Sequence, residues 1–165
     1  MPDNRVILID TSVFLNLLRV PGRCGDADAC RKEFERLAKA DVKFVLPITT
    51  IVETGNFIQQ CTGDRRAAAQ RFENALIAAT EDAPPWIIRD VKWDPEFVLA
   101  LTAGDSTGTS MVDHFTSKSL GAGDIAILVE RDQFLRQTPY QDVQVWSLDA
   151  GLQAHGRPAH AGGSG

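Results

Sequence analysis

The sequence predicts an α/β protein, a three-layer α/β/α sandwich around a mainly parallel sheet. Two observations support this fold. Short apolar runs alternate along the chain with longer segments whose apolar residues recur at helical spacing. The first run, Arg5 to Ile9, is continuous and apolar, which is typical of a strand buried on both faces. With 165 residues, 44% of them hydrophobic, we expect one domain over 1–153 and a flexible tail over 154–165.

The first half of the chain predicts two strands separated and followed by helices. The strand over 5–9 leads into an apolar helix that Pro21-Gly22 breaks. The second strand, over 43–46, stops at Pro47. Gly63-Asp64 then separates two further helices, the second of which carries its apolar residues on one side. The expected helices cover 13–18, from 26 or 28 to 40, 49–60 and 65–80.

The second half predicts two more strands, over 86–88 and 143–148. Pro84-Pro85 precedes the first of them, and the segment 104–110 is loop-like. A short helical turn is expected after Gly151, before a stretch rich in Gly, Ala and Pro that we expect to be frayed. The expected helices cover 95–103, 111–118 and 124–137.

Composition narrows the functional class. The apolar stretches are strand-sized and interrupted by charge, so we expect neither a membrane span nor a signal peptide. Three cysteines without CxxC spacing indicate reduced thiols in a cytoplasmic protein, without a disulfide framework or zinc site. A net charge of −5 does not indicate overall affinity for nucleic acid, although local basic patches can still bind phosphate.

Four carboxylates follow or adjoin the apolar runs: Asp10, Glu53, Asp124 and Asp149. The carboxyl ends of parallel strands and the helix starts that follow them share one edge of a sheet, where α/β sites are built. Acids that meet there repel one another unless a divalent cation neutralises them. Hard oxygen ligands suit Mg²⁺ or Mn²⁺, and these ions catalyse phosphodiester cleavage.

Each acid also has a purely structural explanation. Asp10 and Asp149 are suitable helix N-caps, and Asp124 is a first-turn acid that the helix dipole stabilises. Thr50-x-x-Glu53 matches a capping box. Four acids that all fall on one sheet edge are explained more economically by one site, which we therefore prefer.

Small polar residues and two glycines surround these acids. The hydroxyls of Thr11 and Ser12 are expected to support the turn after Asp10, and Ser147 to orient Asp149. Gly121 and Gly123 allow a close backbone approach.

We expect the histidines and most basic residues to be ordinary solvent-exposed side chains. We expect His114 to be partly exposed on a helix and His155 and His160 to be solvated in the tail. Two sets of basic residues could contact phosphate, although such residues more often lie on solvent-exposed helix faces. Within the first set we expect the ion pairs Lys32–Glu35 and Arg36–Glu33, each three residues apart on one helix. These sets are Arg19, Arg23, Arg31, Lys32 and Arg36, and then Arg65, Arg66 and Arg71.

The acids lie in four segments that together resemble the motifs of the PIN-domain family. The matching segments are 6–14, 49–53, 120–128 and 145–152. The resemblance implies an α/β/α fold and a metal-dependent endoribonuclease acting on RNA. It implies Asp10 and Asp124 as primary metal ligands, Glu53 as a further ligand and Asp149 as an outer acid. The chain also resembles VapC-like toxins, which implies an antitoxin partner and a homodimer. It is longer than compact toxins of that type, with an extra region over 86–119.

Two other functions remain open from the sequence. A haloacid-dehalogenase-like phosphatase would use Asp10 as its nucleophile, but it needs a second aspartate two residues later, where Ser12 stands. A non-catalytic PIN-like binding domain would keep the acids as caps. Stabilisation by millimolar Mn²⁺ distinguishes a shared carboxylate site from separate caps.

Overall fold

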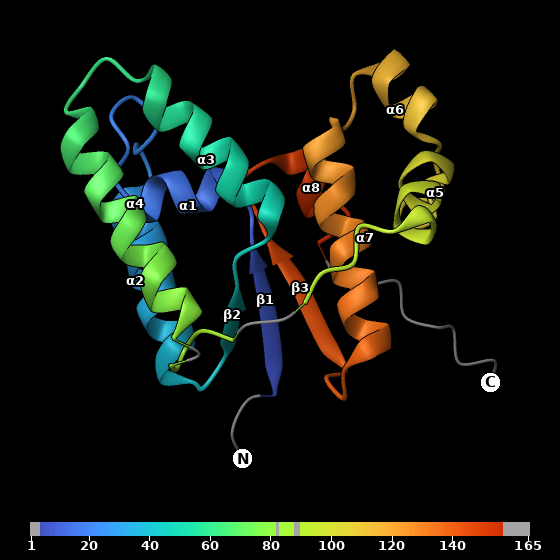
Figure 1. The fold of residues 1–165 in the computed structure, drawn as a ribbon, viewed down its shortest axis with the longest axis horizontal. Coiled ribbons are helices and arrows are strands. Elements are labelled where there is room, and N and C mark those ends of the chain that lie inside the picture. The colour runs from blue at the N-terminus through green and yellow to red at the C-terminus, as the bar shows by residue number, and fades with distance from the viewer. Residues whose placement is uncertain (1–3, 82, 88–89, 157–165) are drawn as a thin grey trace.

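The computed structural model describes residues 4–81, 83–87 and 90–156. Its strands β1 (Arg5–Ile9), β2 (Lys43–Val45) and β3 (Asp142–Trp146) form a parallel sheet in the order β2-β1-β3 (Figure 1). An isolated bridge between Phe44 and Trp86 lies beside β2. The helices of the described chain are α1 (Thr11–Leu17), α2 (Ala27–Lys39), α3 (Ile48–Gln60), α4 (Arg65–Thr80), α5 (Pro95–Ala103), α6 (Met111–Ser117), α7 (Ala122–Gln137) and α8 (Ala150–Gln153).

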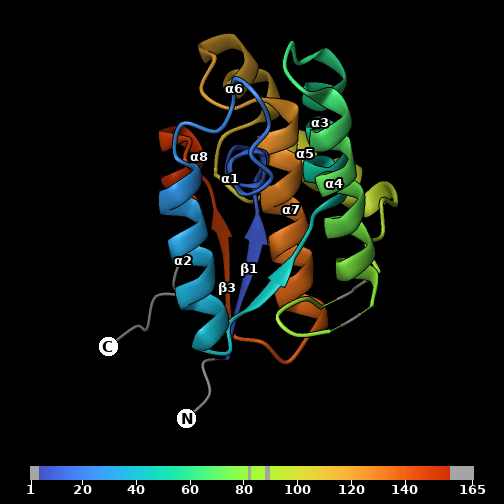
Figure 2. The same ribbon diagram turned by 90° about the vertical axis from the view of Figure 1, so that its left-hand side faces the viewer.

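Both faces of the sheet are covered. Because successive strand residues point to opposite faces, Val6 and Leu8 join the core that α5 and α7 complete, whereas Ile7 and Ile9 join the core formed with α1 to α4. Figure 2 shows α2 and α4 in front of the sheet and α7 behind it. The predicted α/β class with a parallel sheet is therefore confirmed, and helices on both faces are compatible with a three-layer sandwich.

Helix α7 has more buried residues than any other helix of the described chain. Nine of its residues are buried, among them the acid Glu130. The helix runs against the direction of the strands, so its first turn lies at the carboxyl edge of the sheet (Figure 1). This placement brings Asp124 to the edge where β1 and β3 end.

Most predicted elements are found, and two helices have the predicted bounds, α4 and α5. Helix α5 starts where its sequence indicates, because the Asp94 side chain accepts a hydrogen bond from the Phe97 N–H and Pro95 fits the first turn. The strand expected over 86–88 is only the bridge at Trp86 in the described residues, and Ile88 lies outside them.

Buried hydrogen bonds organise the region that includes the loop over 104–110. His114 is only 4% exposed, so the prediction of a partly exposed histidine is wrong. Its ring nitrogens form hydrogen bonds with the hydroxyls of Thr107 (2.8 Å) and Ser119 (2.7 Å). Gly104 ends α5 at a φ of 73°, a conformation that glycine adopts at little cost. The His114 side chain therefore connects the loop over 104–110 to α6 by a hydrogen bond.

The start of the predicted tail is attached to the sheet. The Val145 N–H donates to the Gly156 carbonyl (2.7 Å), and Arg131 donates to the His155 carbonyl. Residues 154–156 are thus not frayed, contrary to expectation, while the remainder of the predicted tail, with His160, lies outside the described residues. Within the described chain, none of the helices has both the length and the apolar character needed to cross a membrane.

Candidate metal centre at the sheet edge

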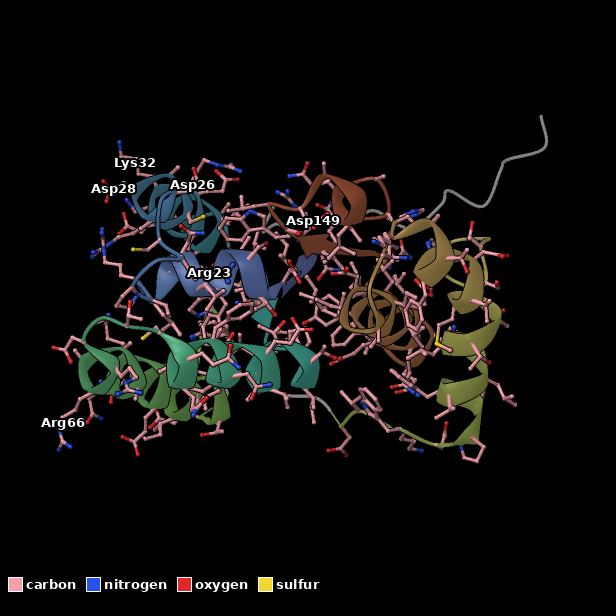
Figure 3. All side chains as sticks on the ribbon, turned by 90° about the horizontal axis from the view of Figure 1, so that it is seen from above. Arg23, Asp26, Asp28, Lys32, Arg66 and Asp149 are labelled. Carbon is pink, nitrogen blue, oxygen red and sulfur yellow. The ribbon has the colours of Figure 1, made fainter. Side chains whose placement is uncertain are left out.

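The four predicted acids come from four separate elements at the carboxyl edge of the sheet. Asp10 follows β1 and is the N-cap of α1, whereas Glu53 lies in α3. Asp124 is in the first turn of α7, and Asp149 is the N-cap of α8. Figure 3 looks onto this edge and shows Asp149 beside α8, on the face of the molecule that also carries Arg23.

Asp10 is the most buried of the four, at 8% exposure. Its Oδ2 accepts hydrogen bonds from the hydroxyls of Ser12 and Ser147, each at 2.8 Å. These hydroxyls in turn accept from the Leu148 and Asp149 N–H groups, at 2.9 and 3.0 Å. Two serines from distant segments therefore fix one oxygen of Asp10. Ser147 orients the Asp10 carboxylate rather than that of Asp149, which corrects the prediction.

Glu53 is held by a residue that follows β1. Its Oε2 accepts a hydrogen bond from the Thr11 hydroxyl at 2.7 Å. The capping-box alternative is wrong, because α3 begins at Ile48 and the Thr50 hydroxyl donates to the Ile9 carbonyl at 2.7 Å instead. Thr50 thus joins α3 to the end of β1, and the Glu53 side chain is left to point at the neighbouring acids.

Gly123 gives Glu53 the space it needs. A Cβ at position 123 would lie 2.0 Å from the Glu53 Oε1 and 3.1 Å from both the Glu53 Cδ and the Thr49 Cγ2. No side chain fits between α7 and α3 at this point without moving Glu53. The close approach expected of Gly123 is therefore present.

Asp124 and Asp149 have local structural roles as well. The Asp124 Oδ2 accepts from the Gly121 N–H at 3.0 Å, and the Asp149 Oδ1 accepts from the Gly151 and Leu152 N–H groups at 2.8 and 3.3 Å. The cap roles expected for Asp10 and Asp149 are thus found, and Asp124 is the first-turn acid that the sequence predicts. In each case the hydrogen bonds engage a single carboxylate oxygen.

Neighbouring acids influence the ionisation of Glu53 and Asp124. Burial raises the pKa of Glu53; the Thr11 hydrogen bond opposes this shift, and the charges of Asp10 and Asp124 add to it. Burial likewise raises the pKa of Asp124; the Gly121 hydrogen bond opposes that shift, and the charges of Asp10 and Asp149 add to it. Glu53 and Asp124 are therefore linked electrostatically to Asp10, and Asp124 also to Asp149, so that burial and repulsion disfavour the ionised forms of Glu53 and Asp124.

One oxygen of each acid accepts no hydrogen bond from the described residues. These oxygens are Oδ1 of Asp10, Oε1 of Glu53, Oδ1 of Asp124 and Oδ2 of Asp149. As the side chains stand in the described chain, no three His, Cys, Asp or Glu residues are grouped closely enough to hold a metal ion. The donor chemistry nevertheless fits a hard divalent cation, because each carboxylate is fixed through one oxygen and offers the other.

Several of the predicted basic residues form ion pairs on the surface. Arg19 pairs with Asp28, Arg36 pairs with Glu33 as predicted, and Glu35 pairs with Arg31 rather than with Lys32. The guanidinium of Arg23 instead lies 4.4 Å from the centroid of the Phe57 ring. Phe57 follows Glu53 by four residues on α3, so the two occupy one face of the helix. The predicted sets did not single out Arg23, because its aromatic partner lies on another element.

Comparison with known protein families, with curated proteins and with solved structures finds no match to this chain.

Proposed function

We propose that this protein is a PIN-like ribonuclease that hydrolyses RNA with the help of Mg²⁺ or Mn²⁺ at the sheet edge. The observation that carries the proposal is the cluster of acids from four elements. Each acid is fixed through one oxygen, and its other oxygen accepts no hydrogen bond from the part of the chain that the structure describes. Acids that served only as separate helix caps would not have to lie close enough to affect one another's pKa values. The resemblance of the four acid-bearing segments to PIN motifs supports the same conclusion, together with the three-layer arrangement it implies.

The chain's own residues would have distinct roles. Asp10, Asp124 and Glu53 would hold the cation, with Asp149 as the more exposed outer acid. A bound divalent cation lowers the pKa of water and stabilises charge on phosphate oxygens. Ser12 and Ser147 would keep Asp10 in position, and Thr11 would do the same for Glu53.

Mn²⁺ is expected to stabilise the folded protein. If the dissociation constant is about 1 mM, 10 mM Mn²⁺ contributes roughly 1.4 kcal/mol to the free energy of unfolding. For a chain of this size that corresponds to a rise of roughly 3–6 °C in melting temperature. Thermal unfolding followed by circular dichroism, with and without Mn²⁺, measures the shift.

The same titration on two variants shows whether the acid cluster is responsible. Asp124→Asn should remove most of the Mn²⁺ response. Asp94→Asn is the matched control, because Asp94 is an N-cap aspartate at the start of α5 and should keep the full response. Equal shifts in both variants and the wild type would rule out the cluster as the binding site. Cleavage of single-stranded RNA that is lost in EDTA and restored by Mn²⁺ would support the proposed activity.

Arg23 is expected to bind an RNA phosphate beside the acids. Its guanidinium packs on Phe57, one helical turn from Glu53, and forms no ion pair among the described residues. In an Asp10→Asn background, which keeps the RNA intact, Arg23→Gln should weaken binding and reduce the slope of log affinity against log salt by about 0.7. Fluorescence anisotropy at several salt concentrations measures both quantities.

Arg31→Gln is the control for Arg23, because the Arg31 guanidinium already pairs with Glu35 on the exposed face of α2. We expect its salt slope to stay at the value of the background. If both variants change the slope equally, the effect reports total charge, and Arg23 is not a specific phosphate contact.

Association with other chains is the remaining part of the proposal, as a homodimer and with an antitoxin protein. Helices α5 and α6, which pack on each other, support an interface because they expose several large apolar side chains. These are Val98, Leu99, Val112 and Phe115.

A further inference from the structure

A second carboxylate site lies away from the sheet edge. Glu130 follows Asp124 by six residues, about 9 Å along α7. It is only 3% exposed, and its buried Oε2 has no hydrogen-bond partner among residues 4–81, 83–87 and 90–156. No ion pair to Glu130 forms in the described part of the chain. An uncompensated buried carboxylate is costly, so folded proteins seldom keep one without a partner or ligand.

Two cavities adjoin Glu130, and Val45 and Val91 line both of them as well. The larger, of about 340 Å³, is mainly apolar. The smaller, of about 230 Å³, has a polar wall and includes two charged groups, Asp90 and Lys92. The apolar side chains that line the larger cavity are Leu46, Ile48, Ile51, Leu76, Ala79 and Ile87.

The wall that the cavities share is fixed to α7. The side chain of Gln133 accepts a hydrogen bond from the Lys92 N–H at 3.3 Å and donates one to the Lys92 carbonyl at 3.1 Å. These bonds anchor the segment that carries Val91. This segment of the wall is therefore held in place without a ligand, which limits the entropic cost of binding.

We propose that this pair of cavities binds a small primary ammonium ion with an apolar body, its cationic end on Glu130 and its chain in the apolar cavity between α3, α4 and α7. A cation supplies the missing partner of the buried carboxylate, and its hydrocarbon part buries apolar surface against the isoleucines and leucines. The proposal is independent of the ribonuclease assignment, because Glu130 is not one of the four acids at the sheet edge.

Hexylammonium chloride is the probe, with 1-hexanol as its neutral counterpart. Titration of the full chain, followed by calorimetry and amide NMR at pH 8.5, should show saturable binding of hexylammonium with shifts at Val45, Ile51 and Leu76. Burial raises the pKa of Glu130 to about 7. The ammonium stays protonated at pH 5.5 while the carboxyl becomes neutral, so the affinity should fall by about 30-fold there. Hexanol should bind weakly and without this pH dependence.

Three variants decide the outcome. Glu130→Gln should abolish hexylammonium binding, and Ala79→Leu should do the same by filling the apolar cavity while keeping the carboxylate. Glu73→Gln removes an exposed acid of α4 and should bind like the wild type. Binding that survives in Glu130→Gln and in Ala79→Leu, or that moves to amides around Asp10 and Asp149, would overturn the proposal. Absence of any saturable binding to the wild type would also overturn it.

Discussion

Asp10→Asn will abolish RNA cleavage, by at least about 100-fold, and leave the fold intact. The magnitude follows from the loss of a proposed metal ligand, because changing even the residues that support metal ligands costs 10- to 100-fold. Stability should be preserved, because the amide can still accept hydrogen bonds from Ser12 and Ser147. Burial raises the pKa values of Glu53 and Asp124, and removal of the Asp10 charge relieves the repulsion that adds to this rise.

Two measurements on the same preparation test this expectation. Cleavage of a labelled single-stranded RNA in Mn²⁺ gives the rate, and chemical denaturation gives the free energy of unfolding. Asp94→Asn should cleave at the wild-type rate, because it changes a capping aspartate outside the cluster. Asp149→Asn should lose less activity than Asp10→Asn, since Asp149 is exposed. Wild-type cleavage by purified Asp10→Asn would refute the assignment of the nuclease site.

NMR titration of the carboxylates checks the electrostatic basis independently of activity. In Asp10→Asn the pKa values of Glu53 and Asp124 should both fall, because the charge of Asp10 raises both in the wild type. If neither pKa value changes, Asp10 does not interact electrostatically with Glu53 and Asp124. Only the local capping roles of the acids would then remain.

The sequence predicts the helices and strands well because their signals are local. Asp94 and Pro95 mark the start of α5 by themselves, and alternating strands and helices place the four acids at one sheet edge without knowledge of any contact. The cap roles of Asp10 and Asp149 are equally local, and they are found. What the sequence cannot show is whether a capping acid has a second role, since that depends on its neighbours in space.

Several of the incorrect predictions involve contacts between distant segments or buried polar groups. The local sequence predicts Thr50 as a helix cap, but its hydroxyl donates to the Ile9 carbonyl, 41 residues away in the chain. Ser147 points to Asp10, 137 residues earlier, because β3 lies beside β1. His114 is buried because its two ring nitrogens find hydroxyl partners in the loops on either side of α6. Local sequence patterns carry no information about such pairings.

Gly123→Ala will reduce RNA cleavage by about 100-fold while changing stability little, since a misplacement of about 1 Å can cost that much. The new Cβ would meet the Glu53 Oε1 at 2.0 Å, so the Glu53 carboxylate must move by more than about 1 Å to restore ordinary contact. The displaced atoms are the end of a flexible side chain, so the backbone can stay in place. Alanine is also the better helix former in the first turn of α7, which offsets part of the cost.

Gly121→Ala provides the matched control, because a Cβ at that position would lie 3.7 Å from the Asp124 Oδ2, an ordinary contact. Its φ of −88° is one that alanine adopts without strain. We therefore expect near wild-type cleavage and stability for Gly121→Ala, in contrast to Gly123→Ala. Equal activity in the two variants would show that the position of Glu53 does not matter for cleavage. Loss of folding in Gly123→Ala would instead show that α3 and α7 cannot adjust, and Glu53→Gln would then be needed to measure the role of the carboxylate, with the same loss of activity expected.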